Sequence, residues 1–259
     1  MDLGIAGKWA IVSGSTRGLG LACAEALAAE GVNIVLNART DQEGEQVAAT
    51  LRSRFEVEVI FVTADVATPE GREAIFAAHS DVDILVTNAS GPSPSSFVDN
   101  SAEQWSEAFD MNFHSAVGMM QLALPGMRER KFGRIINITS AMVTSPHPFM
   151  TLSIAARTAL TGVTKAVSKE VVSDNVTINN ILPERIDTGR QRQMAELQVQ
   201  FRGITLEEAY DEMKQTIAAK RLGRPDEVGA ACAFLASVHA GYISGENLHL
   251  DGGSYDGLI

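Results

Sequence analysis

The sequence contains few cysteines and no excess of basic charge. Its 259 residues include only two cysteines, Cys23 and Cys232, and both lie in alanine-rich stretches typical of helices. Two buried, reduced thiols suit a cytoplasmic protein, and a disulfide scaffold is excluded. Lysine and arginine number 21 against 32 acidic residues, so the formal net charge is −11. A chain this acidic repels nucleic acid and anionic membranes, and neither is expected as a partner.

Long hydrophobic runs are absent as well. No stretch reaches the roughly 18 consecutive apolar residues that a membrane-spanning helix needs. The first residues, MDLGIAGKWAIVSG, carry an acid at position 2 and lack the basic start of a secretory signal. We therefore expect a soluble, cytoplasmic protein, and we predict no metal site.

What the chain does contain is a regular alternation of short apolar runs with alanine-rich helical stretches. The runs are Trp9 to Val12, Asn33 to Leu36, Val57 to Val62, Ile84 to Thr87, Arg134 to Ile138, Thr177 to Leu182 and Asn247 to Leu250. Strands that are apolar on both faces and separated by helices predict a parallel sheet covered on both sides. No repeat or linker interrupts the pattern. We predict one doubly wound α/β domain over residues 1–259.

Residues 188–221 depart from this rhythm, because they form a long helical connection between two predicted strands. Such a connection, beyond the carboxyl end of a strand, is where open α/β sheets place ligand-binding lids. Its apolar positions are equally consistent with core packing. Both interpretations, a lid-like insertion and ordinary packing, stay open from the sequence.

A glycine-rich turn follows the first predicted strand and opens a helix. Gly14, Gly18 and Gly20 in SGSTRGLG are spaced so that backbone amides face a pyrophosphate at the start of that helix. A glycine pattern alone is weak evidence. Its place between a strand and a helix favours a Rossmann-type dinucleotide site over a plain turn.

Further motifs follow along the chain. They are Asp65-Val66, the run Thr87 to Ser90 with Gly91 after it, Asn112 in FDMNF, Ser140 in GRIINITS, and the closing RPDEVGAACAFLAS and YISGENLHLDGG. Together with the glycine turn they resemble the motifs of short-chain dehydrogenases/reductases, most closely those of 3-oxoacyl-carrier-protein reductases. The resemblance covers nearly the whole chain. It implies an oxidoreductase that acts on a small-molecule carbonyl or alcohol.

The resemblance also implies the site residues, and there the sequence departs from the family. A tyrosine and a lysine are expected 13 and 17 residues after Ser140, but Ser153 and Arg157 occupy those positions. The implied catalytic set is therefore Asn112, Ser140, Ser153 and Arg157. The family's Pro-Gly is also altered, to Pro183-Glu184. The residues implied to contact the cofactor are Gly14, Ser15, Arg17, Gly18, Leu19, Gly20, Arg39, Asp65, Val66, Asn88, Ala89, Ser90, Arg157, Pro183, Ile186 and Thr188.

These substitutions bear directly on the chemistry. Reduction of a carbonyl by hydride needs a proton for the forming alkoxide, and serine is a much weaker acid than a phenol. Arg157 supplies positive charge but does not deprotonate readily. Losing a positioned acid costs about 10²- to 10⁴-fold in rate. His147 and Glu184 are candidate substitute acids. The rival interpretation is a catalytically weak or inactive nucleotide-binding sensor or scaffold.

Cofactor preference is also readable from the sequence. NAD-binding folds place an acid at the end of the second strand, where this chain has Asn37, Ala38 and Arg39. Without that acid, Arg39 and Arg17 are suited to grip a 2′-phosphate. NADP(H) is therefore favoured over NAD(H).

Two expectations concern partners. Arg185, Arg190, Arg192 and Arg202 cluster around the helical insertion, where they would bind an acyl or anionic substrate or form a solvated helix face. The helices around residues 105–124 and 153–172 have broad apolar faces. Because these helices pair between subunits in the resembled family, we expect a homo-oligomer, a homotetramer by resemblance.

Overall fold

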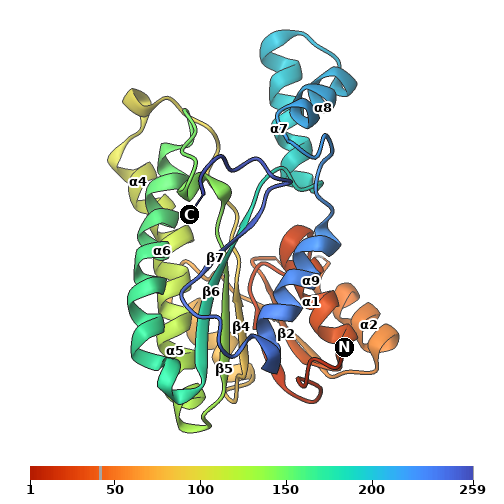
Figure 1. Cartoon of the computed structure of the whole chain (residues 1–259), viewed down its shortest axis with the longest axis vertical. Helices are drawn as coiled ribbons and strands as arrows, with labels where there is room; N and C mark the ends of the chain where they lie inside the picture. The colour runs from red at the N-terminus through yellow and green to blue at the C-terminus, as the bar shows by residue number, and fades with distance from the viewer. Residues whose placement is uncertain (41–42, 259) are drawn as a thin grey trace.

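Seven parallel strands form a single sheet in the computed structural model, which describes residues 1–40 and 43–258. Their order is β3-β2-β1-β4-β5-β6-β7 (Figure 1). The strands are β1 (Trp9–Val12), β2 (Asn33–Ala38), β3 (Val59–Thr63), β4 (Ile84–Thr87), β5 (Gly133–Ile138), β6 (Val176–Pro183) and β7 (Asn247–Leu250). Each predicted run lies within two residues of its strand. The doubly wound α/β fold is confirmed.

Helices cover both faces of this sheet. They are α1 (Gly18–Ala29), α2 (Gly44–Phe55), α3 (Pro69–Ala78), α4 (Ala102–Phe109), α5 (Ser115–Glu129), α6 (Thr151–Val171), α7 (Gly189–Arg202), α8 (Leu206–Gln215) and α9 (Pro225–Ala236). One buried cluster joins α1, α2 and α9 to the sheet, and a second joins α3, α5 and α6 to the other face. Among the described helices, none is long and apolar enough to cross a bilayer.

The central strands are apolar on both faces because both faces are covered. All four residues of β4 are buried, and Ile84 pairs with Ala10 of β1, whose other neighbour is Ile34 of β2. Each fully buried aliphatic side chain contributes about 1.5–3 kcal/mol. The two buried cysteines belong to this packing, with Cys23 on α1 and Cys232 on α9.

The strand order reverses between β1 and β4. From β1 the chain winds outward through β2 and β3, then crosses back to begin β4 on the other side of β1. Ligands of open α/β sheets bind beyond the carboxyl ends of the strands at such a switch point. This edge carries the glycine turn, the segment after β4 and the segment after β5.

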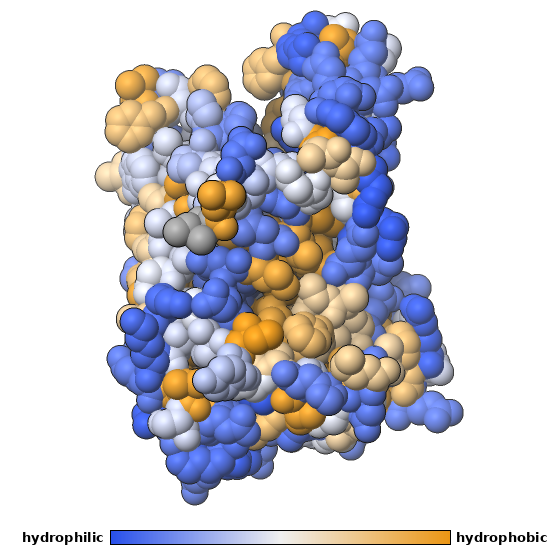
Figure 2. Space-filling model, viewed as in Figure 1, coloured by the Kyte–Doolittle hydropathy of each residue, from blue (hydrophilic) through white to orange (hydrophobic). Residues whose placement is uncertain are grey.

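The insertion between β6 and β7 forms a helical pair, α7 and α8, that projects from the body of the molecule (Figure 1). The two helices share a small apolar cluster of their own, centred on Ala195, Ala209 and Met213. The pair is mostly hydrophilic on its visible surface (Figure 2). The apolar positions of the insertion therefore pack mainly against one another within the helical pair. That the insertion acts as a lid stays a prediction.

Candidate active site

The start of α1 is built to receive an anion. Gly14 and Gly18 have φ angles of +57° and +59°, which favour glycine. The N-cap residue, Arg17, makes no side-chain capping hydrogen bond, and the first turn holds no acidic residue. The amides at this helix end therefore face outward with the positive end of the helix dipole.

Some of the predicted cofactor residues hold the turn itself. The Ser15 hydroxyl accepts from the Asn37 amide at 2.9 Å, and both residues are buried. The Asn88 side chain donates to the Gly14 carbonyl at 3.1 Å. These side chains shape the glycine turn, while Val66 is buried in the core below α3 and α5.

The other predicted cofactor residues lie along the same edge. Arg17 and Arg39 are exposed beyond β1 and β2. One Asp65 oxygen accepts from the Ala67 amide at 3.0 Å. Pro183 ends β6, Ile186 is buried, and Thr188 caps α7. Leu19 is partly buried in the first turn of α1.

Arg157, on α6, is buried and points at the ends of two strands. Its Nη1 donates to the carbonyls of Ile138 and Thr139, both at 2.9 Å, directly before Ser140. Its Nη2 donates to the Ala89 carbonyl after β4 at 3.2 Å. The arginine therefore fixes the segments after β4 and β5 to α6.

The two serines beside Arg157 both accept hydrogen bonds. Ser153 lies one helical turn earlier, and its Oγ accepts from Arg157 Nε at 3.2 Å. The Ser140 Oγ accepts from the Met142 amide at 3.2 Å. Because each oxygen is fixed as an acceptor, each hydroxyl proton is available to a ligand. Hydroxyl donors of this kind suit an oxygen that gains negative charge.

Asn112 lies in a π-helical turn, η2 (Asp110–His114), between α4 and α5. Such turns occur often at functional sites. Its Nδ2 donates to the Ser90 carbonyl at 3.0 Å, whereas its buried Oδ1 has no partner among the described residues. Asn112 and Arg157 line a hollow of about 10 Å³, which is close to the volume that one water needs.

The charge on Arg157 persists at neutral pH. Burial, with a smaller contribution from Arg190, lowers the pKa of its guanidinium to about 10. The group therefore remains protonated near pH 7. No ion pair offsets this charge within residues 1–40 and 43–258. A fixed, buried cation therefore lies in contact with Ser153.

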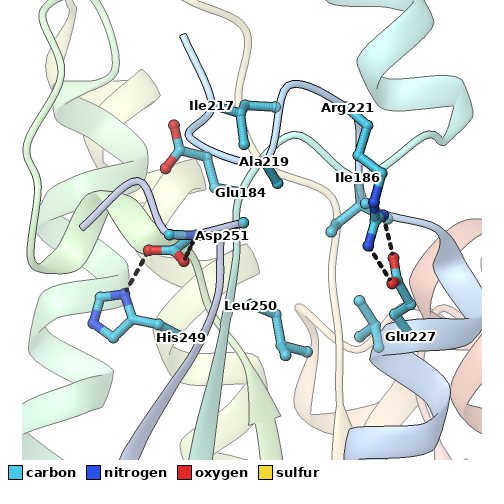
Figure 3. A pocket seen from close by; sticks show the side chains of 13 residues that line it. Glu184, Ile186, Ile217, Ala219, Arg221, Glu227, His249, Leu250 and Asp251 are labelled. Atoms are coloured by element: carbon cyan, nitrogen blue, oxygen red, sulfur yellow. Dashed lines mark hydrogen bonds and ion pairs between the residues drawn. The ribbon is translucent and has the colours of Figure 1, made fainter. Parts of the chain in front are cut away.

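The two candidate substitute acids, His147 and Glu184, contact other groups. His147 is exposed, with its Nδ1 2.9 Å from the Pro148 carbonyl oxygen. Glu184 lines a separate cavity of about 270 Å³ beside His249 and Asp251 (Figure 3). Burial raises the pKa of Glu184, and the nearby Arg185 partly opposes that effect. No hydrogen bond joins either residue to Ser140 or Ser153 in the described structure.

A buried polar network below the site escaped the sequence analysis. Asn137 of β5 accepts from the Thr87 hydroxyl at 2.6 Å and donates to Thr164 at 3.0 Å and Asn180 at 3.2 Å. These contacts tie β4, β5, β6 and α6 together. The asparagines within the otherwise apolar runs of β5 and β6 could have indicated this network from the sequence.

We expect Asn137→Ala to lower the free energy of unfolding by about 2–4 kcal/mol, because it leaves several buried polar groups unpaired. Urea unfolding measures the change. Ser53→Ala is the control, since Ser53 is exposed and its hydroxyl donates to the Thr50 carbonyl of its own helix. A loss below about 1 kcal/mol in Asn137→Ala would show that the network is not required.

Comparison with known proteins agrees with this architecture. A family described as enoyl-(acyl carrier protein) reductase matches residues 14–255. The 3-oxoacyl-[acyl-carrier-protein] reductase FabG of Vibrio cholerae is 34% identical over 257 residues, which cover 98% of this chain and 99% of that protein.

Solved structures give the same result. L-sorbose reductase from Gluconobacter frateurii, in complex with NADPH and L-sorbose, is 33% identical with a TM-score of 0.94 and full coverage of both chains. An actinorhodin polyketide ketoreductase with NADPH is 27% identical with a TM-score of 0.92, covering 96% of this chain and 98% of that one. The chain belongs to the short-chain dehydrogenase/reductase family of oxidoreductases.

Proposed function

We propose that the protein is an NADP(H)-dependent reductase of a small-molecule carbonyl, working through Asn112, Ser140, Ser153 and Arg157. One observation carries the proposal. Two hydroxyls, both fixed as acceptors and both free to donate, lie at the sheet edge that also holds the open start of α1. The reverse reaction, alcohol oxidation, uses the same groups.

The residues at the switch point, where the strand order reverses, fit the phosphate groups of NADP(H). The uncapped start of α1 suits the pyrophosphate, and the exposed Arg17 and Arg39 suit a 2′-phosphate. When bound, the cofactor supplies the hydride that the carbonyl carbon accepts. Solved relatives in complex with NADPH support this choice.

The chain's own residues handle the oxygen. Ser140 and Ser153 donate to the carbonyl oxygen and orient it, while the Arg157 charge stabilises the developing alkoxide. Ser153 passes its proton to that alkoxide and takes one back from a water held at Asn112 Oδ1, and bulk solvent in turn returns a proton to that water. Serine is a weaker acid than the phenol of a tyrosine. The positive charge of Arg157 therefore provides most of the stabilisation of the developing alkoxide.

A turnover assay with NADPH and a panel of ketones, aldehydes and oxo acids tests the proposal. We expect slow but measurable reduction that falls about 10-fold or more in Ser140→Ala and in Ser153→Ala. Absence of turnover on every substrate, with NADPH still bound, would instead support the sensor or scaffold interpretation.

We expect NADPH to bind about 10- to 100-fold more tightly than NADH, since charge-assisted hydrogen bonds to a phosphate contribute about 1.5–3 kcal/mol. Cofactor fluorescence titration measures both affinities. Arg39→Ala should remove most of the difference without changing NADH binding. Arg54→Ala is the control, because this exposed arginine lies on α2 and pairs with Glu25. Equal affinities in the natural protein would contradict the preference.

The expected homotetramer and cytoplasmic location stay predictions. Apolar side chains gather over the middle of the face that contains β7 and α9 (Figure 2). Phe234, Val238, Tyr242 and Leu248 are among the exposed large hydrophobic residues of this region. They support self-association through a face other than the two helices expected from the sequence.

A further inference from the structure

The four arginines around the helical insertion divide into two kinds. Arg192 pairs with Glu196 on its own helix, and Arg202 pairs with Glu212 on α8; both arginines are exposed. For these two the solvated helix face is the correct description. Arg185 and Arg190 are only partly exposed, and neither forms an ion pair within the described residues.

Arg190 lies against the active site. From the first turn of α7, its Nη2 donates to the Pro92 carbonyl at 2.6 Å. Arg157 donates to the Ala89 carbonyl three residues earlier. Two guanidinium groups from different helices therefore hold one short loop, residues 89–92.

This loop also passes close to Ser153. A Cβ built on Gly91 would lie 3.6 Å from Ser153 Oγ and 3.7 Å from Arg157 Nη2. Arg190 is thus bonded to the same four-residue loop that passes close to Ser153 and Arg157. Its charge is close enough to help lower the pKa of Arg157.

The two arginines differ in what they can still bind. Arg157 directs all three of its nitrogens at protein acceptors. Arg190 has five N–H groups, of which one donates to Pro92 and one to Gln193. The remaining donors suit a carboxylate or phosphate, which guanidinium binds in a two-pronged geometry.

We propose that Arg190 binds an anionic group, a carboxylate or phosphate, on the carbonyl substrate and so determines substrate class. Arg157 is buried and Arg190 partly buried, and no ion pair offsets either charge within residues 1–40 and 43–258. The two cations repel each other, and an anion bound to Arg190 relieves the repulsion. The cofactor's pyrophosphate has its own site at α1, beyond β1, whereas Arg190 lies beside the loop after β4. The inference rests on the proposed function.

The test compares matched substrates in matched variants. The substrates are 3-oxobutanoate with its methyl ester, and hydroxyacetone phosphate with hydroxyacetone. The variants are Arg190→Gln and, two residues along α7, Arg192→Gln. We expect the natural protein to prefer each anion over its uncharged partner. Arg190→Gln should lose about 10- to 100-fold in kcat/KM for the anion alone, and Arg192→Gln should lose nothing.

Two kinetic outcomes would overturn the inference. If Arg190→Gln loses equally on charged and neutral substrates while NADPH binds more weakly, Arg190 serves the cofactor. If it loses nothing, the site does not recognise an anion. Calorimetry of the same four compounds with the NADP⁺-loaded protein separates this inference from the proposed function. Binding of the anions that depends on Arg190 but leads to no turnover would retain the anion site and reject the reductase.

Discussion

Replacing Arg157 with methionine is expected to lower kcat/KM for carbonyl reduction by about 10²- to 10³-fold. Methionine fills a similar volume but removes the positive charge that contacts Ser153. Loss of one preorganised electrostatic group at a developing oxyanion costs about 3–4 kcal/mol of activation free energy. Steady-state kinetics with NADPH and the best substrate of the panel measure the loss.

The same change also removes partners from the carbonyls of Ile138, Thr139 and Ala89. We expect the free energy of unfolding to fall by about 2–4 kcal/mol, because relief from burying a charge offsets only part of that loss. Arg157→Lys should retain part of the rate that Arg157→Met loses. Lysine keeps the positive charge but lacks the planar guanidinium group and its several hydrogen-bond donors.

Arg134→Met is the matched control. Arg134 is also buried, near the amino end of β5, and it also donates to main-chain carbonyls, those of Gly133, Asn175 and Ser237. It lies at the opposite edge of the sheet from the site. Its replacement should destabilise the fold but leave kcat/KM of the folded protein unchanged. Equal losses of kcat/KM in both variants would show that Arg157 is only a structural brace.

Gly20→Ala is expected to weaken NADPH binding by about 100-fold or more. A Cβ at this position would lie 2.2 Å from the Gly14 carbonyl oxygen, and 2.9 Å from the Asn88 side chain. The clashing atom belongs to the main chain, which cannot rotate away as a flexible side chain can. The glycine turn must therefore move away from the start of α1. Its amides then no longer converge on the pyrophosphate.

Fluorescence titration with NADPH measures this effect. Gly162→Ala on α6 is the control, because a Cβ there meets nothing within 4 Å and alanine favours a helix. It should bind NADPH as the natural protein does. Unchanged affinity in Gly20→Ala would mean that the cofactor does not use this turn.

The strands were predictable because their physical cause is local. Runs such as Ile84–Thr87 are buried on both faces, and a parallel sheet covered by helices requires that composition. The glycine turn was predictable for a similar reason, since its φ angles at Gly14 and Gly18 need glycine.

Other features depend on contacts between distant segments. Nothing local to Asn112 signals a π-helical turn, and its contact with the Ser90 carbonyl joins residues 22 positions apart. The contact of Arg190 with Pro92 spans 98 positions. Sequence patterning identified the arginines of the insertion but had no means to separate Arg190 from Arg192, because ion pairing and burial are properties of the folded chain.

The most direct test of the central claim, that this site reduces a carbonyl, follows the hydride itself. NADPH carrying deuterium at both C4 positions of the nicotinamide is incubated with the protein and an oxo acid, and the alcohol product is examined by mass spectrometry and NMR. With the natural protein, we predict deuterium on the carbinol carbon of the product. With Ser153→Ala, we predict that the amount of product formed in the same time falls by about 10-fold or more. Unlabelled product, or no product although NADPH binds, would contradict the account.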